Sequence, residues 1–243
     1  MYFNFTNPWM WALLVILIIE NLNYYITTPG AFLSLVLSIP AVLIAITFHE
    51  YAHALAADKL GDDTPRNQGR LTLNPLAHID PYGIILMLTA GFGWGKPVEI
   101  NSNNFTRKVS VRQGNAIVSI AGPCMNFVLA IIFSIIYGLM LKFANNFILT
   151  TTGNVIATMI EYTITMNVGL GVFNLIPLPP LDGSKVILAF LPFNAREWYE
   201  RNEKMLYIIF IIIWITPISS MIISPMISWI DTGLIKLITT IAR

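Results

Sequence analysis

The sequence is poor in charged residues and nearly free of cysteine. Of its 243 residues, 11% are charged and 56% are hydrophobic, whereas a typical soluble domain carries about 25% charged residues. This composition excludes an ordinary soluble domain and predicts an integral protein of the lipid bilayer. The single cysteine, Cys124, excludes an internal disulfide. A formal net charge of +1, with no basic cluster interleaved with aromatic residues, argues against a nucleic-acid partner.

The chain also lacks internal repeats, low-complexity tracts and long polar segments. No connection between its apolar runs exceeds about 25 residues, which is too short for an independent domain. We therefore expect a single membrane domain over residues 1–243, with a core at about residues 31–191. The first eight residues carry no positive charge, and no small-residue cleavage site follows Ile19. The first apolar run is accordingly expected to stay in the membrane and not to be removed as a signal peptide.

Long apolar runs divide the chain into membrane segments. They cover residues 9–26, 31–57, 113–143, 155–191 and 205–230, and a helix needs roughly 20 such residues to cross a bilayer. The fourth run is too long for one straight crossing, and Pro177, Pro179 and Pro180 interrupt it, which indicates a broken helix. We expect an all-α polytopic membrane protein with five to six transmembrane helices.

A shorter apolar run at residues 82–90 is followed by alternating glycines and then by Lys-Pro-Val-Glu-Ile at residues 96–100. The run is too short to cross as a helix, and alternating glycines are typical of a strand or loop. We expect a short membrane-associated helix that leads into a strand or hairpin. Its edge could pair with an extended substrate by β-augmentation; the alternative is a loop that plugs the site.

Lysine and arginine are distributed unevenly along the chain. Ten of the 14 lie in three segments, residues 59–70, 96–112 and 196–204. Because cytoplasmic loops are enriched in these residues, we expect all three segments to face the cytoplasm. The end of the second apolar run then lies on the cytoplasmic side of a multi-pass protein of the cell membrane.

That end carries the pattern H-E-x-x-H, formed by His49, Glu50 and His53. Residues four apart share one face of a helix, so both imidazoles can address one point. Glu50 beside them can act as a general base on bound water, as in a zinc hydrolase. The alternative is a pair of polar residues at a helix end. Three ionisable residues within an apolar segment are costly unless they function there, which favours metal binding.

A catalytic zinc ion needs a third protein ligand. The carboxylates within apolar stretches are Asp182, Glu161 and Glu20. Asp182 follows the prolines of the expected helix break, and Gly183 after it permits close approach to a neighbour. A carboxylate at such a break can point inward at a metal. Glu161 lies in a regular helical stretch, and Glu20 is interpreted as part of a polar helix end.

Three motifs occur in order in separate apolar segments. They are H-E-Y-A-H from His49, G-P-C-M-N ending at Asn126, and N-L-I-P-L-P-P-L-D-G starting at Asn174. Together they resemble the site-2 protease family of intramembrane zinc metalloproteases, over about residues 40–191. The intervening R-L-T-L-N-P-L-A-H-I-D-P-Y-G and G-F-G-W-G-K-P-V-E-I-N resemble its compact prokaryotic branch. No PDZ domain interrupts the chain and no nucleotide-sensing domain follows, so regulation by such modules is not implied.

The resemblance implies one Zn²⁺ per chain, held by His49, His53 and Asp182, with Glu50 as the catalytic base. It also implies hydrolysis of peptide bonds within or near transmembrane segments of other membrane proteins, which are the expected substrates. One alternative is a different membrane zinc hydrolase with a glutamate as its third ligand. Another is a non-catalytic metal-binding or transport protein, against which Glu50 argues because transport needs no general base.

Three further polar residues are candidates for the site. Asn126 and Asn174 are carboxamides in apolar segments and could donate a hydrogen bond to the oxyanion or the substrate. The alternative is that they bond neighbouring helices or the backbone freed by Pro177. His78 could contact the site or fix the loop at residues 74–81, and we favour the loop role.

Overall fold

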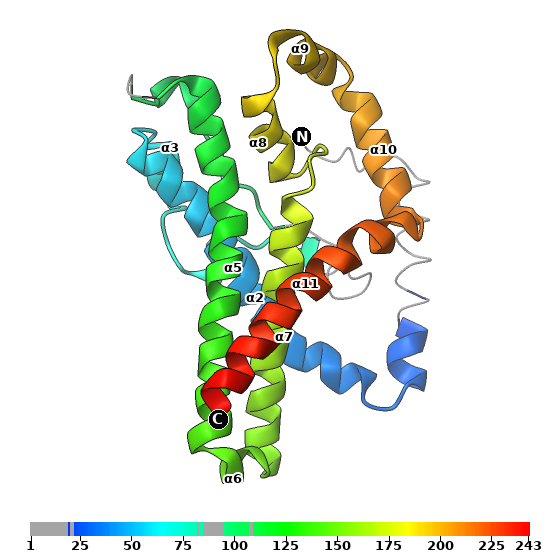
Figure 1. Cartoon of the computed structure of the whole chain (residues 1–243). Coiled ribbons are helices and arrows are strands. Elements are labelled where there is room, and N and C mark those ends of the chain that lie inside the picture. The colour runs from blue at the N-terminus through cyan, green and yellow to red at the C-terminus, as the bar shows by residue number, and fades with distance from the viewer. Residues whose placement is uncertain (1–18, 20–21, 82, 85–94, 107–108) are drawn as a thin grey trace.

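The computed structural model describes residues 19, 22–81, 83–84, 95–106 and 109–243, which are mostly helical (Figure 1). None of these described residues lies in a strand. Residues 22–27 are helical. They are followed by α2 (Ala31–Lys59), α3 (Thr64–Asn67), α5 (Val111–Phe143), α6 (Asn145–Ile148), α7 (Thr151–Asn174), α8 (Asp182–Phe190), α9 (Phe193–Arg201), α10 (Glu203–Ile215) and α11 (Ile218–Ala242). Two 3₁₀ turns, η1 (Pro75–Ala77) and η2 (Ser102–Asn104), lie in the loops. The predicted all-α class is confirmed for these residues.

Four of these helices are long and apolar enough to cross a membrane: α2, α5, α7 and α11. The prediction of a membrane protein is therefore confirmed. The expected total of five to six crossings is not confirmed, because the first apolar run lies mostly outside the described residues. Residues 82 and 85–94 also lie outside them, and residues 95–100 form no regular strand, so the expected strand or hairpin is not confirmed.

The break predicted in the fourth apolar run is confirmed. Helix α7 ends at Asn174, and α8 begins at Asp182 after a segment that contains all three prolines. A proline cannot donate a backbone hydrogen bond, so the preceding helix cannot continue through this segment. Tyr199 on α9 donates a hydrogen bond of 2.9 Å to the carbonyl of Pro177, which ties the break to the following helix.

The expected single crossing at residues 205–230 is wrong. Two helices occupy this run, α10 ending at Ile215 and α11 beginning at Ile218. Thr216 between them has extended backbone angles, with φ −112° and ψ 161°. The residue before a proline is disfavoured in helical conformation, and Pro217 provides the φ that starts the next helix. The proline outweighs the continuous apolar character of the run.

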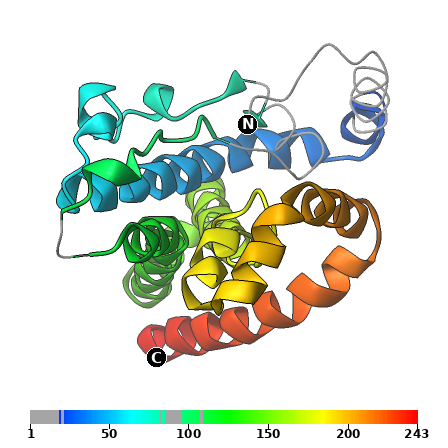
Figure 2. The ribbon, with the colours of Figure 1, turned by 90° about the horizontal axis from the view of Figure 1, so that it is seen from above.

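The spanning helices form a layered bundle around α5 and α7. Helices α5 and α7 run side by side, with α2 packed against one side of the pair and α11 against the other (Figures 1 and 2). A buried apolar cluster joins α5, α7 and α11 through Ala130 on α5, Val168 on α7 and Leu234 on α11. Helix α8 also packs on α5, which brings the end of the proline break to the middle layer.

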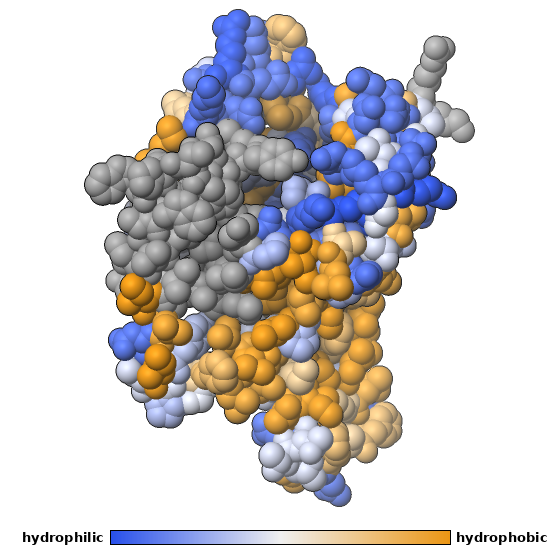
Figure 3. All heavy atoms as spheres, turned by 180° about the vertical axis from the view of Figure 1, so that it is seen from behind, coloured by the Kyte–Doolittle hydropathy of each residue, from blue (hydrophilic) through white to orange (hydrophobic). Residues whose placement is uncertain are grey.

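The surface divides into an apolar body and a polar end. Figure 3 shows hydrophobic residues over the middle and lower part of one face and hydrophilic residues at its upper end. Helix α3, the start of α5 and helix α9 lie together at that upper end in Figure 1. Large apolar side chains such as Ile131 and Ile235 are exposed on the body. Such side chains suit contact with lipid and not with water.

Candidate active site

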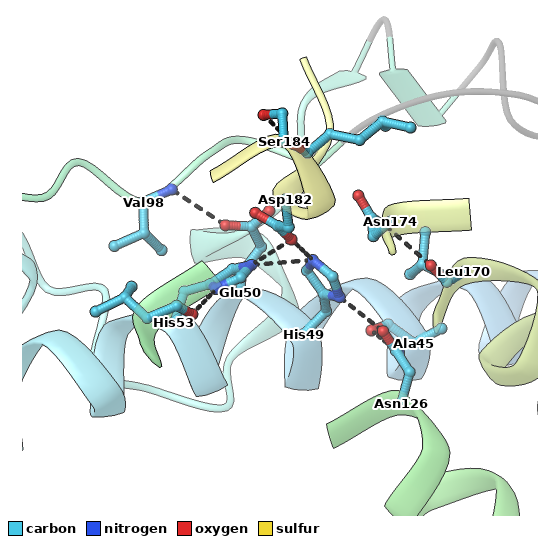
Figure 4. Close-up of polar contacts among 12 residues, drawn as sticks. Ala45, His49, Glu50, His53, Val98, Asn126, Leu170, Asn174, Asp182 and Ser184 are labelled. Carbon is cyan, nitrogen blue, oxygen red and sulfur yellow. Dashed lines mark hydrogen bonds and ion pairs between the residues drawn. The ribbon is translucent and has the colours of Figure 1, made fainter. Parts of the chain in front are cut away.

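The two histidines of the H-E-x-x-H pattern and the aspartate after the helix break meet at one point (Figure 4). His49 and His53 lie one turn apart on α2 and are both buried, with exposed fractions of 5% and 7%. Asp182 is the first residue of α8. The Nε2 atoms of the histidines are 3.0 Å apart, and Asp182 Oδ2 lies 3.1 Å from that of His49 and 3.0 Å from that of His53.

The opposite ring nitrogen of each histidine is held by helix α5. His53 Nδ1 lies 2.7 Å from the carbonyl oxygen of Val118, and His49 Nδ1 lies 2.6 Å from Asn126 Oδ1. Both partners can accept a hydrogen bond, which favours the tautomer of each imidazole that carries its proton on Nδ1. In that tautomer each Nε2, which lies 3.0–3.1 Å from Asp182 Oδ2, has a lone pair available for a metal ion. This arrangement of outer hydrogen bonds is typical of metal-ligating histidines.

Glu50 lies on the same helix but is engaged by a different part of the chain. Its Oε2 accepts a hydrogen bond of 3.1 Å from the backbone N–H of Val98. A side chain added at Gly95 would place its Cβ 3.5 Å from Glu50 Oε1 and 2.7 Å from Ile46. The segment at residues 95–98 therefore passes directly over the catalytic-base candidate.

A buried arginine fixes this segment. Arg70 is 4% exposed and donates hydrogen bonds to the carbonyl oxygens of Ala77, Lys96 and Pro97. These bonds tie residues 95–98 to the loop that follows α3. A guanidinium suits this role because its donors form a rigid planar fork. Arg70 is the first residue of the R-L-T-L-N-P-L-A-H-I-D-P-Y-G motif. Nothing in that motif predicts its burial, since a single arginine in a polar loop is ordinarily solvated.

His78 has the structural role that we favoured. It is fully buried, its Nε2 lies 2.7 Å from the carbonyl oxygen of Thr72, and its own carbonyl accepts the N–H of Lys96 at 2.8 Å. It does not join the group formed by the two histidines of α2 and Asp182. His78 thus fixes its loop against residues 95–98 and is not placed as a metal ligand.

A second buried group joins the end of α2 to the chain before α5. Asp62 accepts hydrogen bonds from the N–H and hydroxyl of Thr64, the N–H of Asn101 and the amide of Asn104. Burial by itself would raise the pKa of Asp62, but these hydrogen bonds stabilise the carboxylate and hold its pKa below the usual value. An ionised Asp62 therefore fixes the loop that continues from residues 95–98.

Comparisons with known proteins identify the family. The model of peptidase family M50 matches residues 37–216. This chain belongs to peptidase family M50. It is 38% identical over 201 residues to YwhC of Bacillus subtilis, named as a zinc metalloprotease, covering 82% of this chain and 90% of the relative. Rip2 of Mycolicibacterium smegmatis, also named as a zinc metalloprotease, is 29% identical over 188 residues, covering 75% and 68%. No solved structure matches.

The M50 match makes this chain a zinc metalloprotease of the site-2 protease type, and His49, His53 and Asp182 offer candidate ligand atoms for that metal. Their mutual distances are 3.0–3.1 Å. A tetrahedral zinc ion with bonds of about 2.0–2.2 Å separates its ligand atoms by about 3.3–3.5 Å. Each ligand atom would need to move outward by only a few tenths of an ångström. Two neutral imidazoles and one carboxylate also leave a fourth position for water, as in catalytic zinc sites.

A glycine of the second M50 motif makes the close approach of α5 possible. Gly122 lies on α5 opposite the histidines, and an added Cβ would lie 2.5 Å from His53 Nε2 and 2.7 Å from the imidazole of His49. Real Cβ atoms do not approach this closely. The clashing atoms belong to rings already held by hydrogen bonds at Nδ1, so they cannot easily retreat.

We expect Gly122→Ala to reduce zinc affinity by at least about 10-fold, because the methyl group displaces the histidine nitrogens from the metal position. The affinity is measured by competition with a chelator. Gly169→Ala on α7 is the matched control, since no atom lies within 4 Å of its Cβ position. That control should keep zinc affinity and gain up to about 1 kcal/mol of stability from helix propensity. Equal affinities for the two variants would contradict the close-approach argument.

The side chains of the other predicted site residues in the described part of the chain are hydrogen-bonded within the bundle. Asn126 uses both amide hydrogens, donating to Ala45 O at 3.1 Å and to Asn167 Oδ1 at 2.8 Å, so it keeps no donor for an oxyanion. Asn174 donates to the carbonyl of Leu170 at 3.0 Å. Glu161 accepts the hydroxyl of Tyr137 and is outside the ligand group. Glu20 lies outside the described residues.

Proposed function

We propose that this M50 protein is an intramembrane endopeptidase that cuts peptide bonds within or near transmembrane segments of other membrane proteins. In this proposal His49, His53 and Asp182 hold one zinc ion, and Glu50 is the catalytic base. The observation that carries it is the meeting of two ligands from a membrane-spanning helix with a carboxylate from a proline-broken one. Ionisable residues at such a position are functional by default.

The proposed chemistry assigns each residue one task. When bound, zinc lowers the pKa of coordinated water and polarises the scissile carbonyl. Glu50 takes the proton of the attacking water on its carboxylate and returns it to the leaving amine. Val98 N–H donates to Glu50 Oε2, so Glu50 Oε1 is the oxygen that would accept the water proton. Asn174 remains a candidate for the oxyanion donor, since it is the last residue of α7, immediately before the helix break.

Metal removal tests the proposed activity. The purified protein is mixed with a single-span substrate in detergent or liposomes, and cleavage sites are mapped by mass spectrometry. We expect cleavage inside the apolar span, its loss after chelation and its recovery on adding zinc. Cleavage confined to a soluble part of the substrate would refute intramembrane action. Cleavage that persists without metal would refute the zinc mechanism.

We further propose a multi-pass topology with the active site toward the cytoplasm. The three segments rich in lysine and arginine are adjacent to α3, the start of α5 and α9, which share one end of the molecule (Figure 1). Positive charge favours the cytoplasmic side for that end. The turn around α6 lies at the opposite end and carries few charges. Adding the apolar run at residues 9–26 to the four spanning helices gives five crossings, the lower figure of the expected five to six.

Cysteine labelling tests this topology. Asn67→Cys and Asn145→Cys are made separately in a Cys124→Ala background, because Cys124 is the only cysteine. Both asparagines are exposed and lie near opposite ends of the bundle. In intact cells, a membrane-impermeant maleimide should label the Asn145 variant and spare the Asn67 variant. The reverse pattern would invert the proposed orientation.

A further inference from the structure

Two buried asparagines from different helices form a hydrogen-bonded chain behind His49. Asn126 on α5 and Asn167 on α7 are both fully buried. Asn126 Nδ2 donates to Asn167 Oδ1 at 2.8 Å, and Asn167 Nδ2 donates to the carbonyl of Thr163 at 2.8 Å. At its other end, Asn126 Oδ1 lies 2.6 Å from His49 Nδ1. These hydrogen bonds therefore connect the backbone of α7 to the imidazole of His49 without interruption.

Groups that can only accept hydrogen bonds fix the direction of this chain. Thr163 contributes a backbone carbonyl, so Asn167 must turn its nitrogen to it and its oxygen to Asn126. Asn126 must in turn direct its nitrogen at Asn167 Oδ1 and at the carbonyl of Ala45, 3.1 Å away. Its oxygen then faces His49, and an oxygen can only accept. His49 must therefore keep its proton on Nδ1, which leaves Nε2 free.

We propose that Asn167 is a positioning residue for the metal centre. Its hydrogen bonds are with Asn126 and Thr163 and not with a proposed metal ligand. It fixes the amide orientation of Asn126 and, through Asn126, the tautomer and ring orientation of His49. This inference rests on the proposed role of His49 as a zinc ligand. Without Asn167, one amide hydrogen of Asn126 would be buried without an acceptor. The hydrogen bond that keeps the Asn126 nitrogen toward α7, and therefore its oxygen toward His49, would be lost. Outer partners of this kind typically change metal affinity by about 10–100-fold.

A double-mutant cycle in the full-length protein tests the inference. Zinc affinity is measured by chelator competition for Asn167→Leu, Asn126→Leu and the double variant. We expect each single variant to bind zinc about 10–100-fold more weakly. The double variant should bind no more weakly than Asn126→Leu, because Asn167 acts only through Asn126. Losses that multiply in the double variant would show a general structural role and overturn the proposal.

The matched control is Thr163→Val on the same helix. It removes a buried hydroxyl that donates to the carbonyl of Met159 but keeps the backbone carbonyl that Asn167 needs. Zinc affinity should be unchanged in this control. An Asn167→Leu variant that matched the control in zinc affinity would also overturn the proposal. If Asn167→Leu does not fold, Asn167→Ala is used for the same comparison, because it removes the amide without introducing a branched side chain.

A spectroscopic readout separates tautomer control from stability. The chain has three histidines, so selective ¹⁵N labelling of histidine yields few signals. In the zinc-loaded protein the Nδ1–H signal of His49 should persist in Thr163→Val and should shift or exchange faster with solvent in Asn167→Leu. An unchanged signal in Asn167→Leu would refute the proposed route. Full zinc affinity in His49→Ala would instead refute the proposed metal site itself.

Discussion

Replacing Glu50 by glutamine should abolish measurable peptide cleavage while zinc remains bound. Glutamine keeps the size of the side chain and still offers an oxygen to the N–H of Val98, so the segment at residues 95–98 stays in place. The three proposed zinc ligands are untouched. What is lost is the carboxylate that takes the water proton, and general acid–base groups contribute roughly 10²–10⁴-fold to rate. We therefore expect a fall in kcat of that size or greater.

The measurement pairs zinc content with cleavage of a single-span substrate. Glu99→Gln is the matched control, because it makes the same change at an exposed glutamate in the adjoining segment, where Glu99 accepts a hydrogen bond from Gln68. That variant should cleave at the wild-type rate. If Glu50→Gln cleaved as fast as the control, Glu50 would not be the base. If it lost zinc, its effect on cleavage would say nothing about proton transfer.

Local patterns were sufficient to predict the half of the site that lies on α2. His49 and His53 are one helical turn apart, so the helical period alone places both imidazoles on one face. The position of Asp182 depended on the proline break, which the sequence also displays. The family motifs then connected these two parts of the chain, and the structure brings them within hydrogen-bonding distance.

The outer part of the site could not be predicted in the same way. Arg70 reaches carbonyl oxygens up to 27 residues away, and Asn126 reaches Asn167, 41 residues away. Such contacts follow from helix packing, which no local period encodes. A buried carboxamide in an apolar helix is a signal of polar bonding, but it does not reveal the partner. For Asn126 the sequence therefore left open an oxyanion donor and a bond between helices, and both of its donors are used within the bundle.

The prediction of a single crossing at residues 205–230 was wrong for a different reason. Thr216-Pro217 is a signal for a helix boundary. The prediction of one crossing relied instead on the uninterrupted hydrophobicity of the flanking residues. Length and hydropathy indicate that a segment can enter a membrane, whereas proline decides whether it does so as one helix. The same rule, applied to Pro177, correctly separated α7 from α8.

Asp182→Asn should lower zinc affinity by more than about 100-fold. Loss of an outer hydrogen-bond partner of a ligand typically lowers metal affinity by about 10–100-fold, and this variant changes a proposed ligand itself. Asp182 Oδ2 lies within 3.1 Å of both histidine Nε2 atoms, so the carboxylate supplies the only negative charge in the described ligand group. Asparagine has nearly the same shape but is neutral and a weaker ligand. The variant therefore tests charge and coordination without opening a cavity.

Glu161→Gln is the decisive comparison for Asp182→Asn. Glu161 is the other carboxylate of α7 and α8 and accepts the hydroxyl of Tyr137 on the neighbouring helix. If Asp182 is the third ligand, Glu161→Gln should bind zinc with wild-type affinity and retain cleavage. If Glu161→Gln loses zinc and Asp182→Asn keeps it, the centre is that of a hydrolase with a glutamate ligand. Loss in both variants would mean that the bundle, and not one ligand, had been disturbed, which thermal unfolding of the apoproteins would reveal.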